Sequence, residues 1–192
     1  MLQNYVLLGD SQAGRFANSF HKRLREISRE HCYSGFSINE LKAKLKEAGY
    51  FGGPYLSNRY LLFIGTNDLL RSRTLEELKR DYVSLVKYLL RQSGWNGRVI
   101  LVAIPPIPRL ANKPKFWIRF HFLNRIIHSF ASHPKVSVIE VKTYEGNSIT
   151  RPELFERFYR DGRRDLIHIN RDFCRELFVA FNRACESIVF EE

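Results

Sequence analysis

Hydrophobic residues along this chain fall into two patterns that alternate with each other. Short, nearly continuous hydrophobic runs are followed by longer segments in which hydrophobic residues recur at every third or fourth position. A run without alternating polar positions is typical of a parallel strand that is buried on both faces. On this basis we predict strands at residues 4–8, 31–33, 60–64, 99–104 and 136–141.

The segments between these runs predict helices that are hydrophobic on one face. The first begins at Ser11, and its hydrophobic face holds Phe16, Phe20, Leu24 and Ile27. Two later helices are predicted by capping boxes, in which each residue of a pair binds the backbone N–H of the other. These pairs are Ser37 with Glu40 and Thr74 with Glu77. Further helices are expected at residues 115–132 and 171–189.

Strands and helices alternate five times along the chain. This order predicts an α/β fold, a three-layer sandwich in which helices cover both faces of a five-stranded parallel sheet. The length and the 44% hydrophobic content suit one domain that spans residues 1–192. In sheets of this kind, ligands bind beyond the carboxyl ends of the strands. Residues directly after the strands are therefore the first candidates for a site.

Three short motifs occupy such positions or precede a helix. Gly-Asp-Ser ends at Ser11, Gly-Thr-Asn-Asp contains Asn67, and a third motif runs from Asp165 to His168. A serine hydroxyl becomes a good nucleophile only when a nearby base removes its proton, and histidine has a suitable pKa. We therefore predict that Ser11 is a nucleophile and His168 its base. Asp165 is predicted to orient the imidazole.

The oxyanion that forms during acyl transfer needs hydrogen-bond donors directed at it. The backbone amide of Ser11 lies at a predicted helix N-terminus and is one such donor. The backbone amide of Gly35 and the side-chain amide of Asn67 complete the predicted set.

Other residues compete for these roles. Asp161 is an alternative carboxylate shortly before the predicted one, and Gly49 or Gly52 would replace Gly35. Ser11 would also serve as an ordinary helix N-cap. These alternatives remain open at the level of the sequence.

Basic residues are concentrated in the middle of the chain. The whole chain has a net charge of +11, and residues 91–141 carry eight Lys and Arg against one Glu, a net charge of +7. Such an excess attracts polyanions such as nucleic acid or an anionic membrane surface, although a solvated basic face has the same composition. The candidate nucleic-acid contacts are Arg109, Lys113, Lys115, Arg119 and Arg125. Trp117 has the helical spacing of a core residue, and base stacking on it is the alternative.

No hydrophobic run approaches the roughly eighteen residues of a membrane-spanning helix, and the first residues lead into a strand without a cleavable signal. We therefore expect a cytoplasmic protein without a transmembrane segment. The three cysteines lack the spacing of metal ligands and are expected to be free thiols. They are Cys32, Cys174 and Cys185.

The combination of Ser11, Gly35, Asn67 and His168 resembles the four marker residues of the SGNH (GDSL-type) hydrolases, and Asp165 completes that family's triad. The resemblance extends over nearly the whole chain. It implies a flavodoxin-like, five-stranded sheet and the hydrolysis of a small ester or acylated substrate through an acyl-enzyme. It implies no metal or organic cofactor.

The chain departs from this pattern at Gln12, where an apolar residue is common, at Leu166, where glycine is usual, and in its basic charge. Two nucleic-acid-linked relatives share the same core: the esterase domain of some retrotransposon proteins and the OSK domain of Oskar. The OSK domain looks like an SGNH fold that lost catalysis and binds RNA. The resemblance therefore leaves two functions open, a serine esterase and an RNA-binding module on an inactive scaffold.

Overall fold

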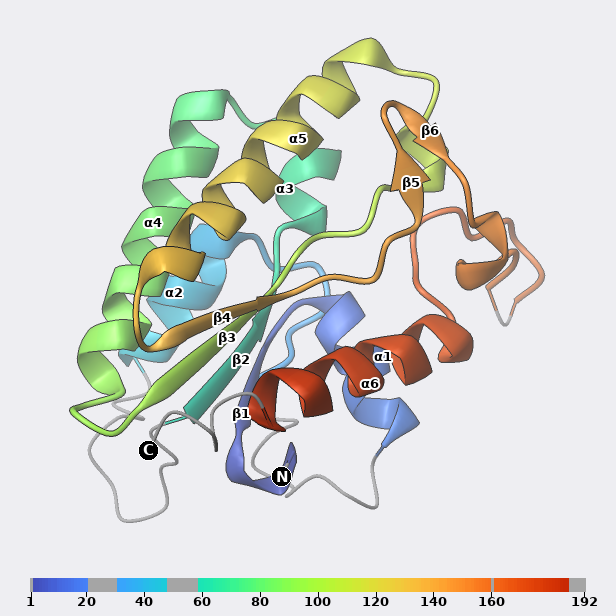
Figure 1. Cartoon of the computed structure of the whole chain (residues 1–192). Coiled ribbons are helices and arrows are strands. Elements are labelled where there is room, and N and C mark those ends of the chain that lie inside the picture. The colour runs from blue at the N-terminus through green and yellow to red at the C-terminus, as the bar shows by residue number, and fades with distance from the viewer. Residues whose placement is uncertain (1, 21–30, 48–58, 160, 187–192) are drawn as a thin grey trace.

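A parallel sheet forms the centre of the molecule (Figure 1). The computed structural model describes residues 2–20, 31–47, 59–159 and 161–186. Tyr60 pairs with Val6 on one side and with Val99 on the other, and Val99 pairs with Val136. The four strands, in their order across the sheet, are β1 (Val6–Gly9), β2 (Arg59–Phe63), β3 (Arg98–Val102) and β4 (Val136–Ile139).

Helices cover both faces of this sheet, which gives the predicted α/β sandwich. Helices α2, α4 and α5 pack together on one face, and α1 and α6 pack on the other (Figure 1). The helices are α1 (Ser11–Ser19), α2 (Ile38–Glu47), α3 (Thr66–Leu70), α4 (Leu75–Gln92), α5 (Pro114–Ser129) and α6 (Arg171–Glu186). Both predicted capping boxes are confirmed at the start of α2 and α4.

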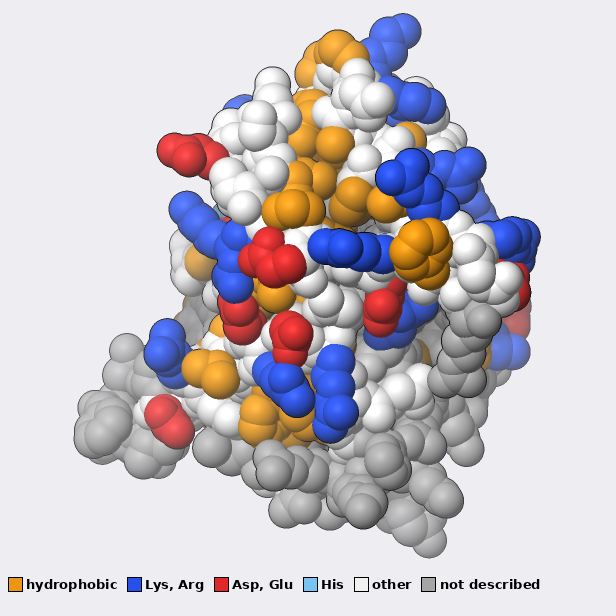
Figure 2. Space-filling model, turned by 90° about the vertical axis from the view of Figure 1, so that its right-hand side faces the viewer, with side chains coloured by type: hydrophobic (Ala, Val, Ile, Leu, Met, Phe, Trp, Pro, Cys, Tyr) orange, Lys and Arg blue, Asp and Glu red, His pale blue; other side chains and the backbone are white. Residues whose placement is uncertain are grey.

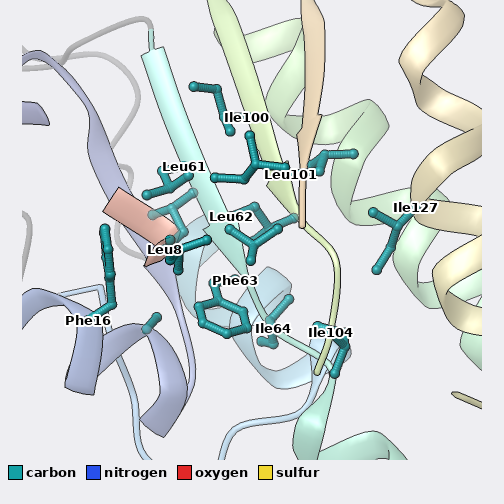
Figure 3. Close-up of a cluster of buried hydrophobic side chains, with 14 of the residues drawn as sticks. Leu8, Phe16, Leu61, Leu62, Phe63, Ile64, Ile100, Leu101, Ile104 and Ile127 are labelled. Carbon is teal, nitrogen blue, oxygen red and sulfur yellow. The ribbon is translucent and has the colours of Figure 1, made fainter. Parts of the chain in front are cut away.

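The hydrophobic core lies between the sheet and its two helical layers (Figure 3). Phe16 of α1 and Ile127 of α5 are fully buried against the strands. Trp117 is only 3% exposed, and its indole N–H donates to the Ala111 carbonyl at 2.7 Å. The core position predicted for Trp117 is therefore confirmed, and its faces are not available to a stacked base.

The prediction of five strands is wrong by one. Residues 31–33 form a single parallel bridge, in which Cys32 lies opposite Gly9 on the edge of β1 away from β2. The Gly9 N–H donates to the His31 carbonyl at 3.1 Å, and the Tyr33 N–H donates to the Gly9 carbonyl at 2.9 Å. The bridge lies at the last residue of β1, so in this parallel register further pairing along β1 would involve residues before His31, and residues 21–30 lie outside the described part of the chain. After the bridge the chain turns at residues 33–36, where Gly35 has a φ of 83°. The bridge still occupies the place of the second strand in a flavodoxin-like order.

Strand β3 ends before the predicted residue 104 because its neighbour β4 ends at Ile139. The backbone of Ile104 pairs instead with the Asn124 side chain, which accepts from its N–H at 2.8 Å and donates to its carbonyl at 3.0 Å. The segment after β4 contains a small hairpin, β5 (Tyr144–Glu145) and β6 (Ser148–Ile149). The continuation of the first helix over 21–30 and of the last over 187–189 lies outside the described residues.

None of the described helices is both long and apolar enough to cross a membrane. The three cysteines are free thiols, as expected, and Cys174 and Cys185 are buried.

Candidate active site

Ser11 is placed by a tight junction between β1 and α1. A side chain at Gly9 would put its Cβ 2.0 Å from the Phe63 carbonyl oxygen, so only glycine fits at the end of β1. Asp10 is the N-cap of α1 and accepts from the Gln12 N–H at 2.9 Å. Ser11 is therefore the first residue of the helix and not its cap. Its own N–H has no acceptor within the helix, because the first N–H groups of any helix lack one.

The structure brings Ser11, His168 and Asp165 together in one hydrogen-bonded chain. Ser11 Oγ lies 3.1 Å from His168 Nε2, and His168 Nδ1 lies 2.9 Å from Asp165 Oδ2. Asp165 is fully buried, whereas Ser11 and His168 are half-buried. This is the geometry in which a histidine takes the proton of a serine hydroxyl while a carboxylate holds the opposite nitrogen.

The Asp-x-x-His spacing has a local cause. Asp165 Oδ1 accepts from the backbone N–H groups of Ile167 and His168 at 3.0 and 3.1 Å. These bonds close a turn, and the turn brings the His168 imidazole within hydrogen-bond distance of the same Asp165 carboxylate. The alternative carboxylate, Asp161, is exposed and binds Arg163 instead.

Gln12 holds the histidine segment against α1. Its Nε2 donates to the Ile167 carbonyl at 3.0 Å, and its Oε1 accepts from the Ile169 N–H at 3.1 Å. The side chain is fully buried. Gln12 thus binds the backbone on both sides of His168, and the departure from the SGNH pattern at this position has a structural role.

Helix α3 holds the segment that contains Gly35. Asn67 donates to the Phe36 carbonyl at 3.0 Å, and Asp68 accepts from the Ile38 N–H at 3.0 Å. Arg71 donates to the Gly35 carbonyl at 2.8 Å. A primary amide carries two N–H groups, so Asn67 has one more donor than its bond to Phe36 uses. The other glycine candidates, at positions 49 and 52, lie outside the described residues.

Burial and charge change the proton affinity of the site. Burial, followed by the nearby Arg15 guanidinium, lowers the pKa of His168, while the hydrogen bond and charge of Asp165 oppose that shift. Arg15 reaches the site from α1 and contacts Asp165 Oδ2 at 3.3 Å. Arg15 was not predicted from the sequence, although its position four residues after Ser11 places it on the same helical face.

The five candidate nucleic-acid contacts lie on α5 and in the segment before it. One of them, Arg109, adjoins the turn that carries His168, because its backbone N–H donates to the Leu166 carbonyl at 2.8 Å. Arg109, Lys113, Lys115 and Arg125 are exposed, and Arg119 is half-buried. None of the five forms an ion pair with a carboxylate in the described part of the chain. On the face shown in Figure 2, Lys and Arg form several groups separated by hydrophobic and acidic side chains.

Comparison with known proteins defines first the class of fold and then the family. A GDSL-family lipolytic protein from Veillonella parvula is 16% identical with a TM-score of 0.64, covering 91% of this chain and 93% of that one. A lipase/acylhydrolase from Enterococcus faecalis is 15% identical with a TM-score of 0.62, covering 93% of each chain. The fold is therefore similar to that of the SGNH hydrolases.

The OSK domain family matches residues 15–180, and the chain belongs to this family. The C-terminal domain of Drosophila Oskar is 19% identical with a TM-score of 0.76, covering 97% of this chain and 90% of that one. No curated protein sequence matches the chain. The suspected SGNH fold with an OSK relationship is thus confirmed.

Proposed function

We propose that this protein is a serine ester hydrolase that works through an acyl-enzyme. The observation that carries the proposal is the continuous chain of hydrogen bonds from Ser11 Oγ through His168 to the buried Asp165. A serine that serves only as a helix cap would not need a histidine and a buried carboxylate in line with its hydroxyl.

In the first half of the reaction, Ser11 Oγ attacks the carbonyl carbon of the ester and His168 Nε2 takes the hydroxyl proton. Asp165 stabilises the imidazolium that results and keeps Nδ1 protonated and directed away from the serine. The tetrahedral intermediate then breaks its bond to the alcohol oxygen. His168 returns the proton to that oxygen, and the alcohol leaves.

In the second half, water replaces the alcohol. His168 removes a proton from the water as it attacks the acyl carbon, and then returns the proton to Ser11 Oγ as the acid is released. We assign the stabilisation of both oxyanions to the Ser11 and Gly35 backbone amides and to the second N–H of Asn67. The chemistry needs no metal or organic cofactor.

The test is hydrolysis of p-nitrophenyl acetate and butyrate by the purified protein. Ser11→Ala should abolish hydrolysis while leaving the circular dichroism spectrum and the melting temperature unchanged. Ser129→Ala is a matched control, because the exposed Ser129 hydroxyl donates to the Ile126 carbonyl of its own helix, and the substitution keeps the Ser129 backbone. If the wild-type rate on a broad panel of esters is no higher than that of Ser11→Ala, the proposal is wrong.

A second function, RNA binding by the basic segment of residues 91–141, has its own support. Four of the five basic candidates are exposed, and none of the five is neutralised by a carboxylate in the described part of the chain. The resemblance described above implies that the OSK domain has an SGNH fold and binds RNA. In its strict form this alternative makes the protein an RNA-binding module whose marker residues are idle, and Ser11→Ala then changes nothing.

A further inference from the structure

Arg15 links the helix that carries Ser11 to the buried carboxylate of Asp165. One guanidinium N–H donates to Asp165 Oδ2 at 3.3 Å, and another donates to Glu156 Oε1 at 3.2 Å. Asp165 is fully buried, whereas the side chains of Arg15 and Glu156 are 33% and 37% exposed. Arg15 therefore connects a buried carboxylate to one that still meets solvent.

Asp165 needs such a cation when the proposed base is ready to act. A buried carboxylate is costly unless an opposite charge and hydrogen bonds compensate it. His168 must be neutral to accept the serine proton, so at that stage it gives Asp165 a hydrogen bond but no positive charge. Arg15 supplies the positive charge from the opposite side. The backbone N–H groups at Asp165 Oδ1 supply the remaining hydrogen bonds.

Building on the hydrolase function proposed above, we propose that Arg15 and Glu156 form a charge couple that positions Asp165 and adjusts the strength of His168 as a base. The positive charge of Arg15 offsets part of the effect that the negative charge of Asp165 has on the imidazole. Glu156 moderates this effect because it neutralises part of the charge of Arg15. Both are positioning residues, since each acts on the imidazole through Asp165 or through the other.

The groups that face His168 set the signs of the expected effects. Ser11 and Arg15 face it from α1, and Asp165 faces it from the turn that carries His168 itself. Glu156 and Tyr159 face it from the preceding segment, and the ring centroid of Tyr159 lies 5.8 Å from that of His168 in an edge-on arrangement. After the larger effect of burial, Arg15 lowers the pKa of His168, whereas Asp165 and Glu156 raise it. Removing Arg15 should therefore raise the pKa of His168, and removing Glu156 should lower it.

The experiment is an NMR titration of the His168 imidazole in wild type, Arg15→Gln and Glu156→Gln. The His168→Asn variant assigns the signal among the six histidines. We expect shifts of opposite sign in the two variants. Arg15→Lys should return the pKa of His168 toward the wild-type value, because it keeps the charge but loses the planar fork. Arg98→Gln is a control for net charge, since Arg98 begins β3 at the other end of the sheet.

A pH profile of kcat/KM on p-nitrophenyl acetate separates this inference from the hydrolase proposal. An active protein whose His168 pKa is unmoved in both variants, or moves in one direction in both, overturns the couple and leaves the hydrolase standing. An inactive protein with opposite shifts keeps the couple and overturns the hydrolase. If Arg15→Gln does not fold, Arg15→Lys and Glu156→Gln decide. A His168 pKa that is near wild type in Arg15→Lys and lowered in Glu156→Gln supports the couple. Any other pattern overturns it.

Discussion

Gln12, the residue after Ser11, is hydrogen-bonded to Ile169, the residue after His168. The Gln12 Oε1 accepts from the Ile169 N–H at 3.1 Å, across 157 positions of sequence. Together with the bond from Gln12 Nε2 to the Ile167 carbonyl, it fixes the segment that carries the imidazole to the helix that carries the hydroxyl. The distance between Ser11 and His168 thus depends on a neighbour that takes no part in the chemistry.

Gln12→Leu should destabilise the fold and slow hydrolysis. The substitution leaves the buried Ile169 N–H and the part-buried Ile167 C=O without their Gln12 partner, which costs about 2–4 kcal/mol in the free energy of unfolding. We expect kcat to fall as well, because the imidazole is no longer held at a fixed distance from the hydroxyl. Urea unfolding and steady-state kinetics measure the two effects. Gln92→Leu, at the end of α4, is the control, and an equal loss of stability in both variants would contradict the role of Gln12.

The pH dependence of hydrolysis should report His168. The imidazole must be neutral to accept the serine proton, and burial lowers its pKa because it disfavours the charged form. The activity should therefore persist to lower pH than the ordinary histidine pKa of 6.5 would allow, and should then fall as acid protonates the ring. The measurement is kcat/KM between pH 4.5 and 9. A rate that stays constant down to pH 4.5 would argue against histidine as the base.

Arg71→Ala should reduce the rate without unfolding the protein. Arg71 bonds to the Gly35 carbonyl and to Glu40, and its side chain is 48% exposed, so its loss costs little stability. The Gly35 amide should become less well fixed. We expect a loss of about tenfold in kcat, smaller than the roughly hundredfold or greater loss expected when Asn67→Ala removes a proposed oxyanion donor. Arg175→Ala, which breaks an exposed ion pair with Asp172, is the control. Equal rates for Arg71→Ala and wild type would show that the turn at residues 33–36 keeps its conformation without Arg71.

The sequence predicts the sheet and the three residues of the hydrogen-bonded chain because both leave local patterns in the sequence. A buried parallel strand is a continuous hydrophobic run, and Asp165 reaches His168 through a turn that its own side chain closes. The fifth strand was predicted wrongly because Gly9, the residue that Cys32 pairs with, is the last residue of β1, and a run of three residues does not reveal where its partner strand ends. Gln12 and Arg15 were missed as site residues because their partners, Ile167, Ile169 and Asp165, lie far away in sequence.

The last prediction concerns RNA binding by the basic segment. Phosphate contacts release condensed counterions, so RNA affinity that rests on them falls as salt rises, by a slope of about 0.7 per contact for a single strand. Replacing the five candidates with Gln should weaken binding of single-stranded RNA and flatten its salt dependence. The set is Arg109, Lys113, Lys115, Arg119 and Arg125.

A matched variant removes five exposed charges from α2 and α4 instead. These residues are Lys44, Lys46, Lys79, Arg80 and Lys87. Filter binding at two salt concentrations compares wild type with both variants, and all three proteins should still hydrolyse p-nitrophenyl acetate, because none of the ten residues belongs to the proposed site. A specific interface loses affinity only in the first variant. Equal losses in both variants would mean that RNA responds to net charge alone, and equally weak binding by all three proteins would mean that the basic segment is a solvated face.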